Sequence, residues 1–107
     1  MNEKKYEITN IAHPHYPWLH RIRALRDVRE DVHAGDLGGF VQSEENLSQE
    51  GQCWIAGNAV AAEEAYVYGN AIIEDYAIVT AGYVHGNVHI SGNAKLFANS
   101  VTGGIPI

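Results

Sequence analysis

The sequence predicts an all-β protein whose second half is a stacked solenoid, and three observations lead to this prediction. A six-residue repeat runs from residue 41 to residue 105. Within each unit the first residue is mostly small, and the third is mostly a branched aliphatic residue. Gly-Asn pairs recur at unit ends, and these residues accept the turn and left-handed conformations that a corner requires. A repeat this short predicts coils that pack mainly on the coils directly above and below.

The N-terminal 40 residues lack the repeat and are expected to cap it. Residues 6–8 and 19–25 alternate apolar and polar side chains, which is typical of strands, and residues 13–17 supply a loop between them. Such a β-hairpin would cover the first coil, whose strand edges are otherwise unpaired. The chain therefore divides into an N-terminal β capping segment, residues 1–40, and a repeat region, residues 41–107.

Eleven units in register make up the repeat region, and only residues 77–81 form a five-residue unit. In a triangular coil the third residue fills the centre of a flat strand, while the residue near a corner must be small because neighbouring strands converge there. Three units make one coil, so about four coils are expected. Taking every third unit gives three inward columns: Gln49, Val67, Val84 and Thr102; Ile55, Ile73 and Ile90; and Ala61, Val79 and Leu96.

This pattern resembles the left-handed parallel β-helix of hexapeptide-repeat proteins. The resemblance covers residues 41–105 and implies an all-β fold, a short left-handed parallel β-helix of about four coils capped by the N-terminal β-hairpin. The segments 5–10, 20–27 and 35–48 look like the N-terminal module of small, uncharacterised hexapeptide-repeat proteins of bacteria and their phages. The same solenoid serves acyltransferases, γ-type carbonic anhydrases and proteins without catalysis, so the resemblance implies a fold and leaves the activity open.

Aromatic and aliphatic residues at outward positions predict contact surfaces. The alternative is that a flat sheet accepts tyrosine and isoleucine on either side, and for the tyrosines we favour the contact surface. The first outward face is expected to hold Tyr66, Tyr68, Tyr83 and His85, the second Trp54, Ile72 and His89, and the third Val60, Ile78 and Phe97.

Charge is distributed unevenly along the chain, whose formal net charge is −6. Residues 1–30 carry six Lys or Arg and four Asp or Glu, whereas residues 31–107 carry nine acids and one base, Lys95. An acidic surface repels nucleic acid and attracts basic partners, or it occupies a nucleic-acid-binding groove as a mimic of nucleic acid. Alternatively, it simply keeps a small protein soluble. The arginines of residues 20–29 are expected to pair with the acidic repeat, or with the acidic repeat of a second subunit, rather than to bind phosphate. The predicted acidic surface consists of Glu44, Glu45, Glu50, Glu63, Glu64, Glu74 and Asp75.

Six histidines raise the question of a metal or a catalytic base. His85 and His89 lie four residues apart but on different faces, and the other four have no acidic neighbour at a ligating spacing, so no metal site is expected. Hexapeptide acyltransferases use one histidine as a general base between subunits, and the resemblance would give this role to His85. Their protruding loop and C-terminal extension have no counterpart here, so we expect no catalytic residue and no cofactor. Cys53, at a small inward position, is expected to be core.

These observations favour a non-catalytic acidic β-helix interaction protein, encoded by a phage or mobile element, that inhibits a host protein involved in nucleic-acid defence. The alternatives are a structural self-assembly module and a minimal hexapeptide-repeat acyltransferase. The expected partner is a protein with a basic surface, without direct contact to nucleic acid or membrane. A dimer or trimer of the chain is also expected, and a single cysteine without a signal peptide predicts a cytoplasmic location.

Overall fold

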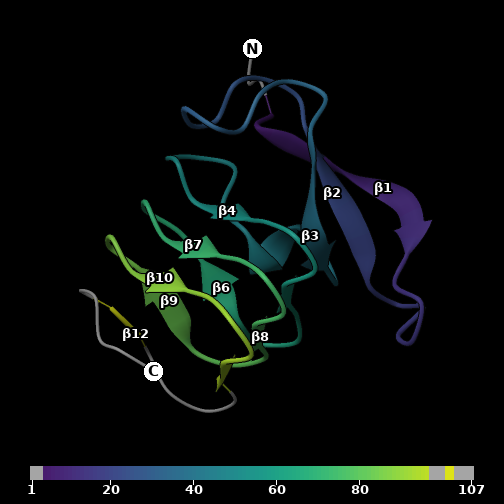
Figure 1. Cartoon of the computed structure of the whole chain (residues 1–107), viewed down its shortest axis with the longest axis vertical. Coiled ribbons are helices and arrows are strands. Elements are labelled where there is room, and N and C mark those ends of the chain that lie inside the picture. Colours follow the sequence, from purple (N-terminus) through teal and green to yellow (C-terminus); the bar gives the residue numbers. More distant parts are fainter. Residues whose placement is uncertain (1–3, 97–100, 103–107) are drawn as a thin grey trace.

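The computed structural model describes residues 4–96 and the backbone of residues 101–102, and over these residues it is all-β with one 3-10 turn (Figure 1). Strands β1 (Tyr6–Ala12) and β2 (His20–Ala24) form the predicted antiparallel hairpin. β3 (Leu37–Val41) and the 3-10 turn η1 (Glu44–Asn46) lead into the repeat. The repeat strands are β4 (Trp54–Ile55), β5 (Val60–Ala61), β6 (Tyr66–Val67), β7 (Ile72–Ile73), β8 (Ile78–Val79), β9 (Tyr83–His85), β10 (His89–Ile90), β11 (Lys95–Leu96) and β12 (Val101–Thr102).

Three sheets form the sides of a short parallel β-helix. One sheet runs in the order β1-β2-β3-β5-β8-β11, so the hairpin extends a side of the helix. The other two run β10-β7-β4 and β12-β9-β6. All pairings between coils are parallel, and in Figure 1 the successive coils descend from the hairpin towards the C-terminal end. The described strands make about three coils, with β11 and β12 beginning another, where the sequence predicted about four.

The inward columns of the central units are confirmed. Their aliphatic residues stack in register across the coils, as Ile55 does on Ile73 and Ile73 on Ile90. These side chains are all buried, and they form one continuous apolar core. The buried members are Ile55, Ala61, Val67, Ile73, Val79, Val84, Ile90 and Leu96. The repeat therefore predicts correctly which side of each strand faces inward.

Coil length changes along the helix, and the predicted register is wrong at both ends. Val41 pairs with Ala61, which follows 20 positions later in the chain. The spacing between paired residues falls to 18 positions for Ile55 and Ile73 and to 17 positions for Val67 and Val84. The five-residue unit 77–81 accounts for the shortened coil. In the long first coil Leu47, not Gln49, bridges to Val67, because two extra residues occupy the following corner. At the other end Val101, not Thr102, pairs with Val84.

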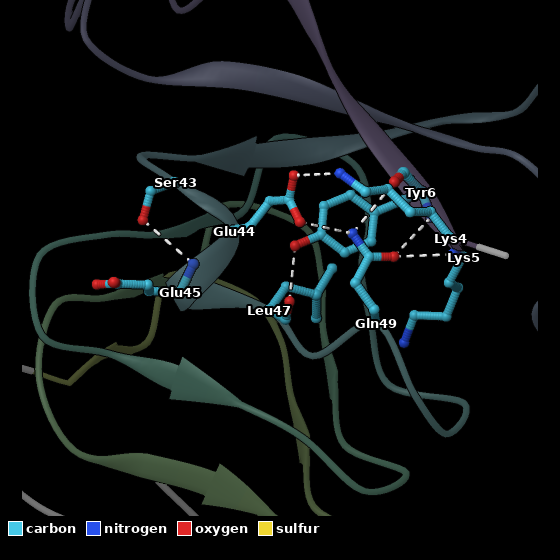
Figure 2. Close-up of polar contacts among 8 residues, drawn as sticks. All are labelled: Lys4, Lys5, Tyr6, Ser43, Glu44, Glu45, Leu47 and Gln49. Carbon is cyan, nitrogen blue, oxygen red and sulfur yellow. Dashed lines mark hydrogen bonds and ion pairs between the residues drawn. The ribbon is translucent and has the colours of Figure 1, made fainter. Parts of the chain in front are cut away.

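The lengthened corner between Leu47 and β4 binds the beginning of the N-terminal segment. The Gln49 carboxamide oxygen accepts hydrogen bonds from the backbone N–H groups of Lys5, at 2.8 Å, and Tyr6, at 3.2 Å (Figure 2). The Tyr6 hydroxyl donates to the Leu47 carbonyl at 2.6 Å. Lys5 and Tyr6 are both fully buried. Gln49 thus leaves the predicted inward column because its polar side chain binds the backbone of the N-terminal capping segment, residues 1–40, which we call the head.

The corners between strands need left-handed backbone conformations. In the Gly-Asn corners the glycine takes this role, with φ of +62° at Gly57 and +72° at Gly69. Two corners use acidic residues instead: Glu63 has φ +55° and Asp75 has φ +63°. Part of the acidic surface is therefore located at corners, where the side chains project from the coil.

Candidate functional site

The first candidate surface lies on the sheet formed by β6 and β9. Tyr66 pairs with Tyr83 and Val67 with Val84, so successive side chains alternate between the two sides of the sheet. Val67 and Val84 are fully buried, which directs the neighbouring aromatic residues outward. We call the four outward residues Tyr66, Tyr68, Tyr83 and His85 the tyrosine face, and the structure brings all four together as the sequence predicts.

Ring contacts connect the whole tyrosine face. The centroid of Tyr68 lies 5.1 Å from that of Tyr66 and 4.9 Å from that of His85, and both pairs are stacked. Tyr83 meets the edge of Tyr68 at 6.4 Å. Tyr83 is 56% exposed, while the other three side chains are half-buried. Because the rings support one another, they present a firm aromatic surface that can bind apolar groups or cations.

The second predicted contact face is only partly exposed. Trp54, Ile72 and His89 do form one column, since Ile72 pairs with both of the others. Trp54, however, is 2% exposed and belongs to the buried core cluster that also contains Val28 and Val32 of the head. The prediction that Trp54 is a surface residue is therefore wrong, because the sequence pattern does not show that residues 25–36 fold over it. Ile72 stays half-buried and His89 exposed.

The third outward column is also covered by the head. Val60 is 4% exposed and packs in a small buried cluster with Leu19 and Phe40, so little of its side chain reaches solvent. Ile78 is half-buried against the same cluster. Lys95 pairs with Ile78 in the next coil, and Phe97 lies outside the described residues.

The predicted acidic residues divide among different corners. Four of them gather at the corner that precedes β6, because the Asn46 side chain donates to the Glu63 carbonyl at 3.2 Å and joins the two turns. We call Glu44, Glu45, Glu63 and Glu64 the acidic corner; all four are exposed. Glu50 lies at the corner before β4, and Glu74 and Asp75 lie at the corner between β7 and β8. The acidic corner directly adjoins the tyrosine face in the chain.

Two acids of the predicted surface form ion pairs within the chain. Glu44 forms a 2.8 Å ion pair with Lys4, shown in Figure 2, and the hydrogen bond from Lys4 lowers the pKa of the Glu44 carboxyl. Glu74 pairs with His89. Within the chain, Arg21 and Arg29 donate to backbone carbonyls of the repeat, at Gly57 and Gln52, rather than to its acids. Pairing of the arginines with the acidic repeat of a second subunit stays a prediction.

The two histidines of the repeat, His85 and His89, do not share a sheet. His85 ends β9 and His89 begins β10, so they lie on different sheets, as predicted. Among the described residues, no group of three or more His, Cys, Asp or Glu side chains is placed to hold a metal ion. Nor does any helix in the described part of the chain have the length and apolar character needed to cross a membrane.

Lys5 is a polar residue whose position sequence reasoning missed. Its ammonium group donates to the Cys53 carbonyl at 2.8 Å and lies 3.1 Å from the Cys53 sulfur. Burial lowers the pKa of Lys5, and Cys53 partly opposes this effect. Cys53 is buried in the core as expected. A lysine just before the first strand carries no sequence signal for burial, because its partner Cys53 is 48 residues away in the chain.

Comparison with known proteins supports the hexapeptide-repeat assignment at the level of the fold. No family model matches the chain. A curated relative from Escherichia coli strain K12, "Uncharacterized acetyltransferase YdcK", is 40% identical over 62 residues, which is 57% of this chain and 19% of the relative. The chain thus spans about a fifth of the length of this relative. Its name points towards enzyme activity, so the expected absence of catalysis is not confirmed.

Proposed function

We propose that this protein is a non-catalytic interaction module that binds a protein with a basic surface through the tyrosine face. The observation that carries the proposal is the contrast in exposure between outward residues. Trp54 and Val60 are covered by the head, while Tyr83 remains 56% exposed. An aromatic surface that stays open while the head covers Trp54 and Val60 of the other two outward columns is a candidate for contact with another molecule.

Charge specifies the chemistry of the partner. Glu63 and Glu64 immediately precede the tyrosine face in the chain, and Glu45 stands at the turn joined to theirs. Arginine or lysine side chains of a partner can therefore lie over the tyrosine rings while pairing with these carboxylates. Such contacts would be weakened by salt, since exposed charge pairs are screened. Phage origin and the inhibition of a host defence protein stay predictions.

The test compares paired variants in affinity capture followed by binding measurements on the purified partner. Tyr66→Ala with Tyr83→Ala removes the rings, Glu63→Gln with Glu64→Gln removes the charge, and His89→Ala is a control on another sheet. Each double variant is expected to weaken binding about tenfold or more, and raising salt from about 50 mM to about 300 mM should weaken the wild type similarly. The control should bind normally.

Two results would contradict the proposal. One is a partner whose affinity depends on neither double variant nor on salt. The other is a dimer or trimer of the chain, measured by sedimentation, that dissociates when Tyr66 and Tyr83 are replaced. That result would show that a second copy occupies the tyrosine face, which is the self-assembly alternative.

A minimal acyltransferase is the second candidate, and the similarity to YdcK is the observation that favours it. His85, stacked on Tyr68, is the residue placed to act as a general base towards an acceptor bound on this face. This function predicts that acetyl-coenzyme A at about 1 mM raises the melting temperature. It also predicts that His85→Ala abolishes acetyl transfer while leaving that thermal shift intact. An unchanged melting temperature would exclude this candidate.

A further inference from the structure

We propose that a cleft on a different sheet from the tyrosine face is a second binding site, and that it binds a small organic anion that carries an aromatic ring and one phosphate. The cleft lies between the hairpin loop, residues 13–18, and the outer side of β5, β8 and β11. It comprises two adjoining cavities of about 290 Å³ and about 520 Å³. Both are lined by Tyr16, Val60, Ile78 and Lys95, which makes them one continuous space of the size that small ligands occupy.

The smaller cavity is the apolar half of the cleft. Tyr16 and Trp18 lie on one side, 43% and 55% exposed, with their ring centroids 5.5 Å apart. Val60 and Ile78 form the other side, above the buried cluster that contains Leu19. Large aromatic side chains held over an apolar floor bind planar rings well. This half is therefore suited to the aromatic part of a ligand.

The loop that carries these rings is held in place before any ligand arrives. Its ends are joined by a 2.8 Å hydrogen bond from the His13 backbone N–H to the Leu19 carbonyl. The His13 ring nitrogen Nδ1 accepts from the N–H groups of His15, at 3.0 Å, and Tyr16, at 3.3 Å. The His13 ring also contacts Phe40 at 4.6 Å between centroids. A loop fixed in this way loses little conformational entropy when it binds.

The larger cavity is the cationic half. Arg21 and Lys95 line it together with His13 and His15, and no carboxylate does so among the described residues. Lys95 is the single Lys or Arg in residues 31–107, an acidic region, and it lies at this cleft. Glu63 lines only the apolar half. Two cationic side chains, Arg21 and Lys95, in one cavity of a chain with net charge −6 favour an anionic ligand.

Arg21 is positioned to hold a phosphate rather than to move freely. Its guanidinium lies 4.3 Å from the centroid of the Phe40 ring and donates to Gly38, Gly57 and Asn58. These three bonds use three of its five N–H donors, which leaves two for a ligand. Because His13 Nδ1 accepts from backbone N–H groups, its other ring nitrogen carries the hydrogen and is a further donor.

The experiment titrates the chain with adenosine 5′-monophosphate, phenyl phosphate, inorganic phosphate and adenosine, followed by amide and indole NMR resonances. At least one of the two monophosphates that carry an aromatic ring, adenosine 5′-monophosphate or phenyl phosphate, is expected to shift the resonances of residues 13–18 and Lys95, with a dissociation constant below about 1 mM. Inorganic phosphate and adenosine should bind about tenfold more weakly, because each fills only half of the cleft. Tighter binding of the nucleotide would identify a nucleoside monophosphate, and the reverse a smaller aryl phosphate.

Variants separate this site from other surfaces. Lys95→Gln and Trp18→Ala should each weaken binding about tenfold. Arg23→Gln removes a cation outside the cleft, and Tyr83→Ala alters the tyrosine face; both should bind normally. The proposal is overturned by the absence of binding at about 5 mM, by equal affinity for inorganic phosphate or adenosine, or by normal binding to both cleft variants. None of these results bears on the tyrosine face.

Discussion

Trp54 and Tyr83 occupy corresponding outward positions, each just before a fully buried aliphatic residue of its strand, yet their surroundings differ. Trp54 is 2% exposed beneath the head, while Tyr83 is 56% exposed. The same contrast separates Val60, covered by the hairpin, from the tyrosine face as a whole. The repeat thus determines which side of a strand faces outward, whereas the non-repetitive head determines which outward residues reach solvent.

Replacing the two residues by alanine gives the largest expected difference. Trp54→Ala should lower the free energy of unfolding by about 3–5 kcal/mol, because it leaves a cavity under the head. Tyr83→Ala should lower it by less than about 1 kcal/mol, since the ring is mostly exposed. Urea denaturation of both variants measures the difference. Equal losses would mean that the head does not stabilise the face it covers.

Two glycines show the same contrast between a crowded and an open position: Gly39 lies against the repeat, and Gly92 lies in open space. A Cβ at Gly39 would lie 2.5 Å from the Ala59 carbonyl oxygen and 2.6 Å from the Ile55 side chain. Gly39→Ala should therefore cost about 2–3 kcal/mol through overpacking. At Gly92 a Cβ meets no atom within 4 Å, and only the φ of +66° disfavours alanine, at about 1 kcal/mol. Thermal unfolding should rank the variants in this order; the reverse ranking would rule out the tight approach of β3 to the first coil.

Tyr6 makes the stability of the folded chain sensitive to high pH. Burial raises the pKa of Tyr6 far above its ordinary value of 10.0. The folded state keeps the proton that the unfolded state loses, so stability is complete below pH 10 and falls as pH rises beyond it. Tyr6→Phe should cost about 1–2 kcal/mol at neutral pH, because the Leu47 carbonyl loses its donor.

The difference between wild type and Tyr6→Phe should shrink above pH 10. Lys5 acts in the opposite direction, since its lowered pKa makes stability rise with pH up to its ordinary value of 10.5. Taking the difference between the two proteins at each pH cancels the Lys5 contribution. Tyr83→Phe, on the uncovered side, is the control at neutral pH. A difference that stays constant between about pH 9 and pH 11 would contradict the role of the Tyr6 hydroxyl.

Glu44, at the edge of the head, should give the smallest effect. Its ion pair with Lys4 is about half exposed on both sides, so Glu44→Gln should cost only a few tenths of a kcal/mol at low salt. Because the pKa of Glu44 is lowered, the ion pair contributes fully to stability at pH values above the ordinary carboxyl pKa of 4.5. This contribution is lost as the pH falls below that value. Chemical denaturation at low and high salt tests this. A cost that persists at high salt would point to the Gln49 hydrogen bond instead.

The central coils could be predicted from sequence because their contacts repeat. Ile55 and Ile73 follow the same local pattern, and the pattern alone places both inward. Trp54 and Lys5 could not be placed, because their burial depends on head segments that dock from far away in the chain. The tyrosine face was predictable because nothing in the described structure covers it. The cleft was not, since it exists only where the aromatic loop of residues 13–18 folds back beside Lys95.

Coil lengths of 20, 18 and 17 residues have a consequence beyond this fold. The strands on either side of a lengthened or shortened corner keep their partners, as Trp54 does with Ile72 and Ile72 with His89. Length variation is therefore absorbed at corners while the apolar core stays in register. The corners are positions where foreign peptide loops can be grafted, which would make this small solenoid a scaffold for displaying new recognition sequences.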